Sequence, residues 1–271
     1  MDEGVRNAGK RSVLGVLIDA VDYDAALDFV FTAVKERRGA AVSAIAVHGV
    51  MTGVLDPEQK FRLNHFDLLV PDGQPVRWVL NGLHRAKLAN RVYGPTLTLR
   101  ICELAVSQRV PLYFYGSTPS VLRGLCTSLI ARFPGLKIAG AEPSRFRSLT
   151  PGERRDIIAR IRSSGAGITL VGLGCPRQEM FAYELRDQLS MPVIAIGAAF
   201  PFIAGLIPQA PEWMQNHGLE WLFRLISEPR RLWKRYLFLN PLYVFLICLQ
   251  SLRLWRFSTE GTVPHCRPVA G

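Results

Sequence analysis

The residue in this sequence with the clearest chemical potential is Asp72, in the stretch FDLLVPDGQPVRW. The apolar run Leu68–Val70 predicts a short buried strand, and Gly73 then begins a turn into a helix. In an open parallel sheet, ligands bind beyond the carboxyl ends of the strands. A carboxylate placed there can act as a general base that takes a proton from an attacking hydroxyl group. The alternative is an ordinary helix N-cap, a position at which aspartate is favoured.

Glycine-containing turns follow two other apolar runs, at Gly172–Glu179 (GLGCPRQE) and at Tyr115–Ser117. The first begins like a dinucleotide-binding fingerprint, but Arg177 occupies the place of the third glycine, and the chain has no Walker A sequence. Nicotinamide redox chemistry and P-loop hydrolysis therefore lose support. A glycine turn that opens a helix, with Arg177 and Gln178 in its first turn, can still bind a phosphate or a sugar hydroxyl. In a parallel sheet both turns would face one crevice with Asp72.

Two further positions are candidates for substrate contacts. Arg91 precedes a Gly-Pro turn in NRVYGPTL, and a guanidinium there suits a diphosphate, although a surface arginine is the alternative. His48 follows an apolar run and is a candidate catalytic residue. The acidic Asp22–Asp24 motif invites a metal-binding interpretation, but it opens a helix, so helix capping is favoured. No paired His, Cys or carboxylate spacing predicts a metal site.

Apolar runs that alternate with helical patterns must position these residues. The expected strands are Ser12–Ile18, Ala41–Val47, Leu68–Val70, Pro111–Tyr115, Leu136–Ala139, Gly167–Leu173 and Pro192–Ile196. The expected helices are Tyr23–Arg37, Gln74–Gly82, Pro95–Gln108, Thr118–Phe133, Pro151–Ser163 and Arg177–Gln188. This alternation predicts an α/β fold with a Rossmann-like parallel sheet flanked by helices. We expect residues 1–205 to form this domain and residues 206–271 to form a C-terminal helical appendage.

The appendage is basic, aromatic and helical, with breaks expected near Pro229 and Pro241. Its apolar stretch Leu237–Leu252 is shorter than the about 20 residues that span a bilayer, so a helix lying in the membrane interface is favoured over an ordinary packing helix with a solvated basic face. The net charge of +11 calls for an anionic partner. Scattered cysteines and an N-terminus without the apolar core of a signal peptide predict a protein of a reducing, cytoplasmic compartment.

Several motifs, in this order and spacing, resemble the WecG/TagA/CpsF family of bacterial glycosyltransferases, glycosyltransferase family 26. They are LLVPDGQPV, RVYGPTL, YFYGSTPSV, FPGLKIAG, LVGLGCPRQE, IGAAFPFIAG and APEWMQNHGLEWLFRLISEPRRLWKRY. The resemblance runs from about Leu14 to Tyr236, and the last block is the most specific.

The resemblance implies an inverting, metal-independent transferase that needs no cofactor. Its donor would be a UDP-sugar of the N-acetylmannosamine or hexose type. Its acceptor would be a polyprenyl-diphosphate-linked saccharide in the synthesis of exopolysaccharide, capsule or teichoic acid. The protein would bind peripherally to the anionic inner face of the cell membrane, through the appendage.

The resemblance also implies roles for single residues. Asp72 matches the catalytic base, Arg91 the arginine that stabilises the leaving diphosphate, and Gln178 a polar residue near the sugar. Arginines of the appendage lie over the active site in the family, and the spacing of seven and four between Arg224, Arg231 and Arg235 predicts one helical face. The expected substrate-binding residues are His48, Gly73, Gly94, Gly116, Gly174, Arg177, Arg224, Arg231 and Arg235.

Three departures from the family pattern bear on the donor preference. The usual Thr-x-Asn after the second strand is absent from SAIAVHGV, where His48 is a candidate substitute. The usual Gly-x-x-Phe-Asp ends in Pro201, and the usual Arg-Ala-Pro begins with Gln209.

Other classes of function remain open. A non-catalytic membrane scaffold derived from such a transferase would bind vesicles but no nucleotide sugar. A nucleic-acid-binding module would explain the charge, but recognisable nucleic-acid motifs are absent and the basic residues gather beside an apolar helix, so we expect no nucleic-acid partner. The oligomeric state is open, with a homo-oligomer as one alternative.

Overall fold

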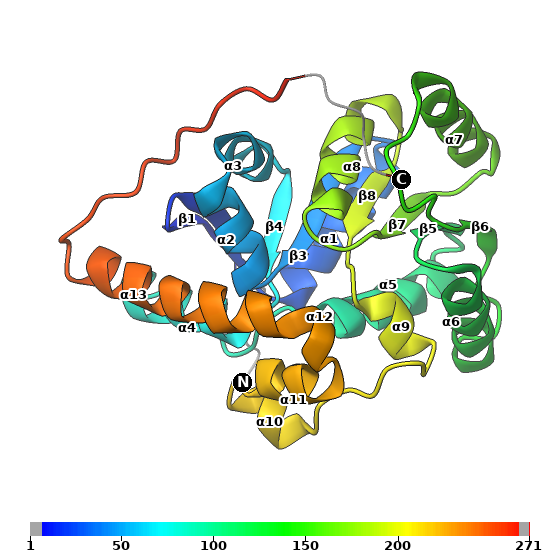
Figure 1. Cartoon of the computed structure of the whole chain (residues 1–271). Helices are drawn as coiled ribbons and strands as arrows, with labels where there is room; N and C mark the ends of the chain where they lie inside the picture. The colour runs from blue at the N-terminus through cyan, green and yellow to red at the C-terminus, as the bar shows by residue number, and fades with distance from the viewer. Residues whose placement is uncertain (1–6, 266–270) are drawn as a thin grey trace.

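A six-stranded parallel sheet forms the centre of the computed structural model, which describes residues 7–265 and 271 (Figure 1). Its strand order is β4-β3-β8-β7-β5-β6, and every neighbouring pair is parallel. The strands are β3 (Ala40–Ile45), β4 (Leu68–Pro71), β5 (Leu112–Gly116), β6 (Ile138–Glu142), β7 (Ile168–Gly172) and β8 (Pro192–Ala195). The predicted parallel α/β architecture is confirmed.

Helices cover both faces of this sheet, because alternate side chains of each strand point to opposite sides. In β5, Tyr113 and Tyr115 join one buried cluster, whereas Leu112 and Phe114 join the other. The first cluster is completed by α2 (Val47–Leu55), α3 (Pro57–Asn64), α4 (Gln74–His84), α7 (Pro151–Ser163) and α8 (Arg177–Leu185). The second is completed by α1 (Tyr23–Lys35), α5 (Gly94–Ser107), α6 (Pro119–Arg132) and α9 (Ala199–Ile203).

Local helix signals also behave as expected. The Asp22 side chain accepts a hydrogen bond from the Ala25 amide at 2.9 Å, so the acidic motif at the start of α1 is a helix cap. Thr150 and Glu153 form a reciprocal capping box at the start of α7.

The predicted strand Ser12–Ile18 is wrong, because this run contains a hairpin turn. Strands β1 (Asn7–Val13) and β2 (Val16–Val21) pair antiparallel outside the main sheet. The turn between them has φ of 54° at Leu14 and 84° at Gly15. Two consecutive positive φ values are typical of a type I′ hairpin turn, for which Asn-Gly is the usual sequence. Here a fully buried leucine takes the first position, so packing overrides the local preference.

Two helices that the sequence analysis did not predict follow β3. The strand ends at Ile45 rather than at Val47, and α2 begins directly at Val47. Helix α3 carries ordinary start signals, since the Asp56 side chain accepts from two amides and Pro57 takes the first helical position.

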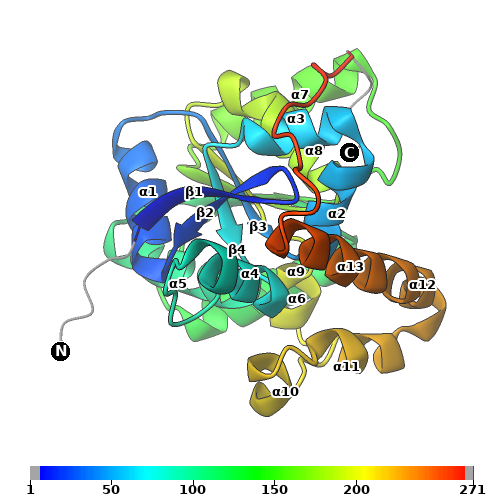
Figure 2. The same ribbon diagram turned by 90° about the vertical axis from the view of Figure 1, so that its left-hand side faces the viewer.

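The C-terminal segment is helical and lies along one side of the sheet domain (Figure 2). It comprises α10 (Glu212–Asn216), α11 (Glu220–Ser227), α12 (Pro229–Lys234), a π-helical turn η2 (Arg235–Leu239) and α13 (Asn240–Ser251). The expected break at Pro229 is present, since α11 ends at Ser227. The expected break at Pro241 is wrong, because the π-helical turn carries the chain into α13 without leaving a helical path. Within the described ranges, no helix combines the length and apolarity needed to cross a membrane.

The far end of α13 is tied to the β1–β2 hairpin. The Gln250 side chain accepts from the Leu14 amide at 3.0 Å and donates to the Ser12 carbonyl at 3.2 Å. Tyr243, on the same helix, is buried in the first cluster. One side chain thus satisfies two backbone groups of the turn.

Replacing this side chain should loosen the attachment of α13. We expect Gln250→Ala to lower the free energy of unfolding by about 1–2 kcal/mol, because a buried amide loses its acceptor. Urea unfolding at unchanged slope measures the effect. Ser251→Ala, at the exposed neighbouring position, should change stability by less than about 0.5 kcal/mol. Equal changes in the free energy of unfolding for the two variants would contradict this role of Gln250.

Candidate functional site

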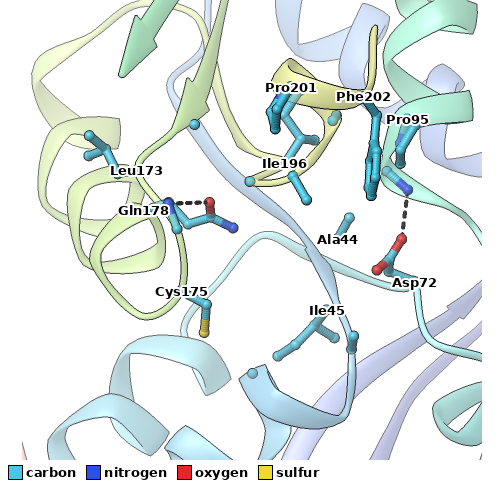
Figure 3. Close-up of a pocket in the computed structure, with 18 of the residues that line it drawn as sticks. Ala44, Ile45, Asp72, Pro95, Leu173, Cys175, Gln178, Ile196, Pro201 and Phe202 are labelled. Atoms are coloured by element: carbon cyan, nitrogen blue, oxygen red, sulfur yellow. Dashed lines mark hydrogen bonds between the residues drawn. The ribbon is translucent and has the colours of Figure 1, made fainter. Parts of the chain in front are cut away.

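Asp72 follows the carboxyl end of β4 and faces a cavity. The Asp72 amide donates to the Ile45 carbonyl at 3.0 Å, which fixes the backbone against β3. Carboxylate oxygen Oδ1 accepts from the Gly94 amide at 2.7 Å, at the first residue of α5 (Figure 3). The N-cap of α4 is Gly73, and no side chain caps that helix. The capping interpretation of Asp72 for its own helix is therefore wrong.

The electrostatic surroundings of Asp72 suit a base. Burial raises its pKa to about 6, and the nearby Glu220 carboxylate acts in the same direction, while Arg91, the Gly94 amide and Arg224 oppose the shift. A carboxylate with a pKa near 6 is ionised at neutral pH yet more basic than an ordinary aspartate.

The cavity beside Asp72 has a volume of about 440 Å³ and lies at the carboxyl ends of the central strands. Figure 3 shows Asp72 and Gln178 on opposite sides of it. Six of the predicted site residues line it, namely Asp72, Gly94, Gly174, Arg177, Gln178 and Arg224. The expectation that separate turns converge on one crevice is confirmed for these residues.

Gln178 is held rigidly in the wall of this cavity. Its Oε1 accepts from the Gly174 amide at 3.1 Å, and its Nε2 donates to Glu179 Oε1 at 2.8 Å. Ser43 also donates to that Glu179 oxygen, at 3.1 Å. Burial raises the pKa of Glu179 above its ordinary value. The hydrogen bond to Glu179 thus fixes the orientation of the Gln178 side-chain amide. The sequence analysis did not assign this role to Glu179.

Gly116 does not line this cavity. A Cβ atom at this position would lie 2.7 Å from the Gly172 carbonyl oxygen, and φ is 111°. The glycine therefore permits the close approach of β5 to β7, and the cavity is lined instead by the next residue, Ser117. A substrate contact at Gly116 itself stays a prediction.

A second, larger cavity of about 1180 Å³ adjoins the first. Ala46, Asp72, Glu220 and Arg224 line both cavities. His48, Gly73 and Arg91 line only the second cavity, whereas Ala44 lines only the first.

Arg91 is bound by residues of the C-terminal helices. Its Nη2 donates to Glu220 Oε2 at 2.7 Å and to Gln215 Oε1 at 3.1 Å, and its Nη1 donates to the Asp72 carbonyl at 3.2 Å. Burial lowers the pKa of Arg91, but the carboxylates of Asp72 and Glu220 outweigh burial and leave the pKa above its ordinary value. Glu220 also accepts from the Tyr93 hydroxyl at 3.2 Å.

Glu220 was missed as a site residue because its partner is distant in sequence. The available signal was an acid inside a strongly basic, aromatic block.

The three appendage arginines do not lie on one continuous helix. Arg224 lies on α11, whereas Arg231 is on α12 and Arg235 begins the π-helical turn, after the helix breaks at Glu228. The predicted face assumed one uninterrupted helix. The side chains of Arg231 and Arg235 lie outside what the structure describes. Arg224 lines both cavities, and its buried Nε has no hydrogen-bond partner in the described part of the chain.

Potential metal ligands are dispersed. In the described ranges, no three His, Cys, Asp or Glu side chains group closely enough to hold a metal ion.

Comparison with known proteins identifies a family and a relative of known activity. The model of the family described as "Glycosyl transferase WecG/TagA/CpsF family" matches residues 11–257. The chain is also similar to an N-acetylglucosaminyldiphosphoundecaprenol N-acetyl-beta-D-mannosaminyltransferase of Bacillus subtilis (strain 168), with 26% identity over 237 residues. That alignment covers 87% of this chain and 90% of the relative.

The raised pKa of Asp72 makes a prediction about stability. Because the folded pKa of about 6 exceeds the about 3.9 of an unfolded aspartate, ionisation opposes folding. This carboxyl therefore lowers stability as the pH rises from about 4 to about 6, and its effect is constant above that. Asn can still accept from Gly94. We therefore expect Asp72→Asn to be more stable than the wild type by up to about 3 kcal/mol near pH 8, and by much less near pH 4.

Urea unfolding of both proteins at the two pH values measures this difference. Asp28→Asn, at an exposed position on α1, is the matched control and should change stability by less than about 0.5 kcal/mol at either pH. A stability gain at Asp72→Asn that does not depend on pH would contradict the raised pKa.

Proposed function

The chain belongs to the WecG/TagA/CpsF family of glycosyltransferases, and on this basis we propose that it transfers a sugar from a UDP-sugar to a polyprenyl-diphosphate-linked saccharide. The printed activity of the Bacillus subtilis relative names N-acetylglucosamine on diphosphoundecaprenol and an N-acetylmannosaminyl group. We infer an acceptor of that class here. The donor sugar would be of the N-acetylmannosamine or hexose type, and the product would serve cell-surface polysaccharide synthesis.

One observation carries this proposal: Asp72 lies where the two cavities meet. We assign the smaller cavity to the donor and the larger to the acceptor. A base at their junction removes the proton from the acceptor hydroxyl as that oxygen attacks the anomeric carbon. The bond from this carbon to the UDP oxygen breaks in the same displacement, so the configuration inverts. General-base assistance of this kind is typically worth about 10²–10⁴-fold.

The leaving UDP needs positive charge, which the arginines can supply. Arg224 faces both cavities and has an unsatisfied Nε donor. Arg91 reaches only the larger cavity and is engaged by Glu220. In our proposal Arg224 contacts the departing diphosphate. Arg91 also contacts the diphosphate once Glu220 no longer binds Arg91. Cationic side chains of this kind stabilise the charge that develops on a leaving group, without requiring a divalent metal.

The remaining predicted residues have distinct places in this scheme. We propose that Gln178 and Arg177 contact the donor, with Gly94 and Gly174 supplying backbone at the wall of its cavity. Gly73 and His48 line the larger cavity and would contact the acceptor.

An acceptor anchored in lipid requires the protein to reach a membrane surface. Most of the exposed large apolar side chains belong to the C-terminal helices, including Trp213, Ile226 and Phe238. Basic residues in the same segment complement an anionic membrane. We propose peripheral binding to the inner face of the cell membrane through α11–α13.

A transfer assay tests the proposed function. Purified protein, anionic liposomes and diphosphate-linked acceptors are incubated with each of four donors, with EDTA present: UDP-N-acetylmannosamine, UDP-glucose, UDP-glucuronic acid and UDP-N-acetylglucosamine. We expect transfer from one donor. Asp72→Asn should lose about 10²–10⁴-fold in turnover while retaining UDP binding. In the wild type, kcat/KM should rise with pH through about 6 and then level off, as the base ionises.

Near-normal turnover by Asp72→Asn would remove Asp72 from the role of base. Donor binding that requires a divalent metal would contradict the metal-independent scheme. Vesicle binding without donor binding or transfer would favour a non-catalytic scaffold.

Membrane binding has its own test. We expect the protein to sediment with vesicles that contain anionic lipid, and Ile226→Ser to weaken this binding by about tenfold, since the isoleucine on α11 is 71% exposed. Ile130→Ser is the matched control, because this isoleucine is 52% exposed on α6. Equal loss in both variants, or none in either, would contradict the assigned surface.

A further inference from the structure

The larger cavity differs from the donor cavity in character. Beyond Asp72, Arg91, Glu220 and Arg224 at its inner end, its walls are mainly apolar side chains of α4, α11 and α13. Trp78, Val79 and Leu83 come from α4, and Tyr243, Phe245 and Ile247 come from α13. Its volume of about 1180 Å³ exceeds the about 300–1,000 Å³ of ordinary small-molecule pockets. The shape and lining suit a long apolar ligand with a charged head.

Helices α4 and α13 lie side by side (Figures 1 and 2), and both line this groove. The Tyr243 hydroxyl donates to the Pro75 carbonyl at 3.4 Å, which links the two helices at one point. Farther out, the groove is lined by side chains that are also exposed: Trp78 (45%), Leu237 (63%), Val244 (59%) and Phe245 (58%). The groove therefore runs from the catalytic carboxylate to the exposed apolar surface of the C-terminal helices.

We infer that this groove binds the first isoprene units of the acceptor's polyprenyl chain, an inference that rests on the proposed function. The saccharide hydroxyl lies at Asp72, and the diphosphate lies at the inner end beside Arg91 and Arg224. The prenyl chain then follows α4 and α13 outward to the membrane surface. Two observations select this occupant over a free nucleotide or a peptide. The groove is continuous with the catalytic cavity through Asp72, and its polarity changes from charged to apolar along its length.

Acceptor chain length provides the first experiment. Two acceptors carry N-acetylglucosamine diphosphate on a farnesyl or an ethyl group. They are compared in detergent-free buffer without vesicles, below the concentration at which the farnesyl compound forms micelles. We expect the wild type to show a KM at least about tenfold lower for the farnesyl acceptor, because only that chain buries apolar surface in the groove.

Filling the groove should abolish this preference. Nothing lies within 4 Å of a Cβ atom built on Gly82, which lines the groove from α4. Tryptophan is also a better helix former than glycine, so Gly82→Trp is expected to fold. We expect it to raise the farnesyl KM by about tenfold and to leave kcat/KM for the ethyl acceptor within about twofold. Gly152→Trp, on the distant helix α7, should leave both values unchanged.

A polar substitution tests the outer part of the groove. Leu237 is 63% exposed and lines the groove, whereas Leu254 is 69% exposed and does not line it. We expect Leu237→Asp to raise the farnesyl KM several-fold and Leu254→Asp to leave it unchanged. A photoreactive farnesyl acceptor should crosslink to peptides of α4 and α13.

Four outcomes would overturn the inference. A wild-type KM that is equal for the two acceptors, while transfer proceeds, would remove the prenyl site and leave the proposed function standing. Crosslinking confined to other helices, or equal effects of Gly82→Trp on both acceptors, would do the same. Absence of transfer to either acceptor from any donor, with no donor binding, would overturn the proposed function together with the inference.

Discussion

The ion pair between Arg91 and Glu220 connects the C-terminal helices to the domain that contains the parallel sheet. Its nitrogen and oxygen atoms are 2.7 Å apart, and the two side chains are only 10% and 16% exposed. Removing one partner of a buried pair leaves an uncompensated charge, which typically costs about 3–5 kcal/mol. Movement of helix α11 away from the site would therefore carry this free-energy cost, unless another anion binds Arg91 in place of Glu220. Both cavities depend on this contact, because Glu220 lines each of them.

The same ion pair influences the pKa of the Asp72 carboxyl. Glu220 raises the pKa of Asp72, and Arg91 lowers it. A nucleotide diphosphate would bring further negative charge into a site that already contains two carboxylates. Arg224, with its unsatisfied Nε, and Arg91 are the cations described at this junction that can balance that charge. Competition between Glu220 and a phosphate for Arg91 would couple the position of α11 to occupancy of the site. In the proposed scheme, this coupling is the role of Glu220 on α11, at the junction of the two cavities.

Much of this arrangement could be predicted from the sequence, because it follows from parallel strand order. Asp72 and Gln178 are more than a hundred positions apart, yet each follows the carboxyl end of a strand, and these ends meet at one edge of a parallel sheet. Features that depend on tertiary packing could not be predicted in this way. The β1–β2 turn is hidden because Leu14 adopts a conformation that glycine or asparagine usually takes. The prediction of one helical face for Arg224, Arg231 and Arg235 assumed a continuous helix, whereas α11 ends at Ser227. Glu220 is acidic in a basic block, but only the fold shows that its partner is Arg91.

The smaller cavity, which we assign to the donor sugar, has a partly apolar wall. Ala44, Ala46 and Pro201 line it, and none of these side chains can donate or accept a hydrogen bond. A site that hydrogen-bonds a hydroxyl group strongly rejects analogues lacking it, whereas an apolar wall discriminates mainly by size. Polar recognition in this cavity falls instead on Gln178, Arg177 and backbone amides, and the contact between Glu179 and Gln178 fixes the orientation of that amide. Discrimination among donor sugars should therefore depend on steric fit at Ala44, Ala46 and Pro201, with Gln178 as the fixed polar reference point.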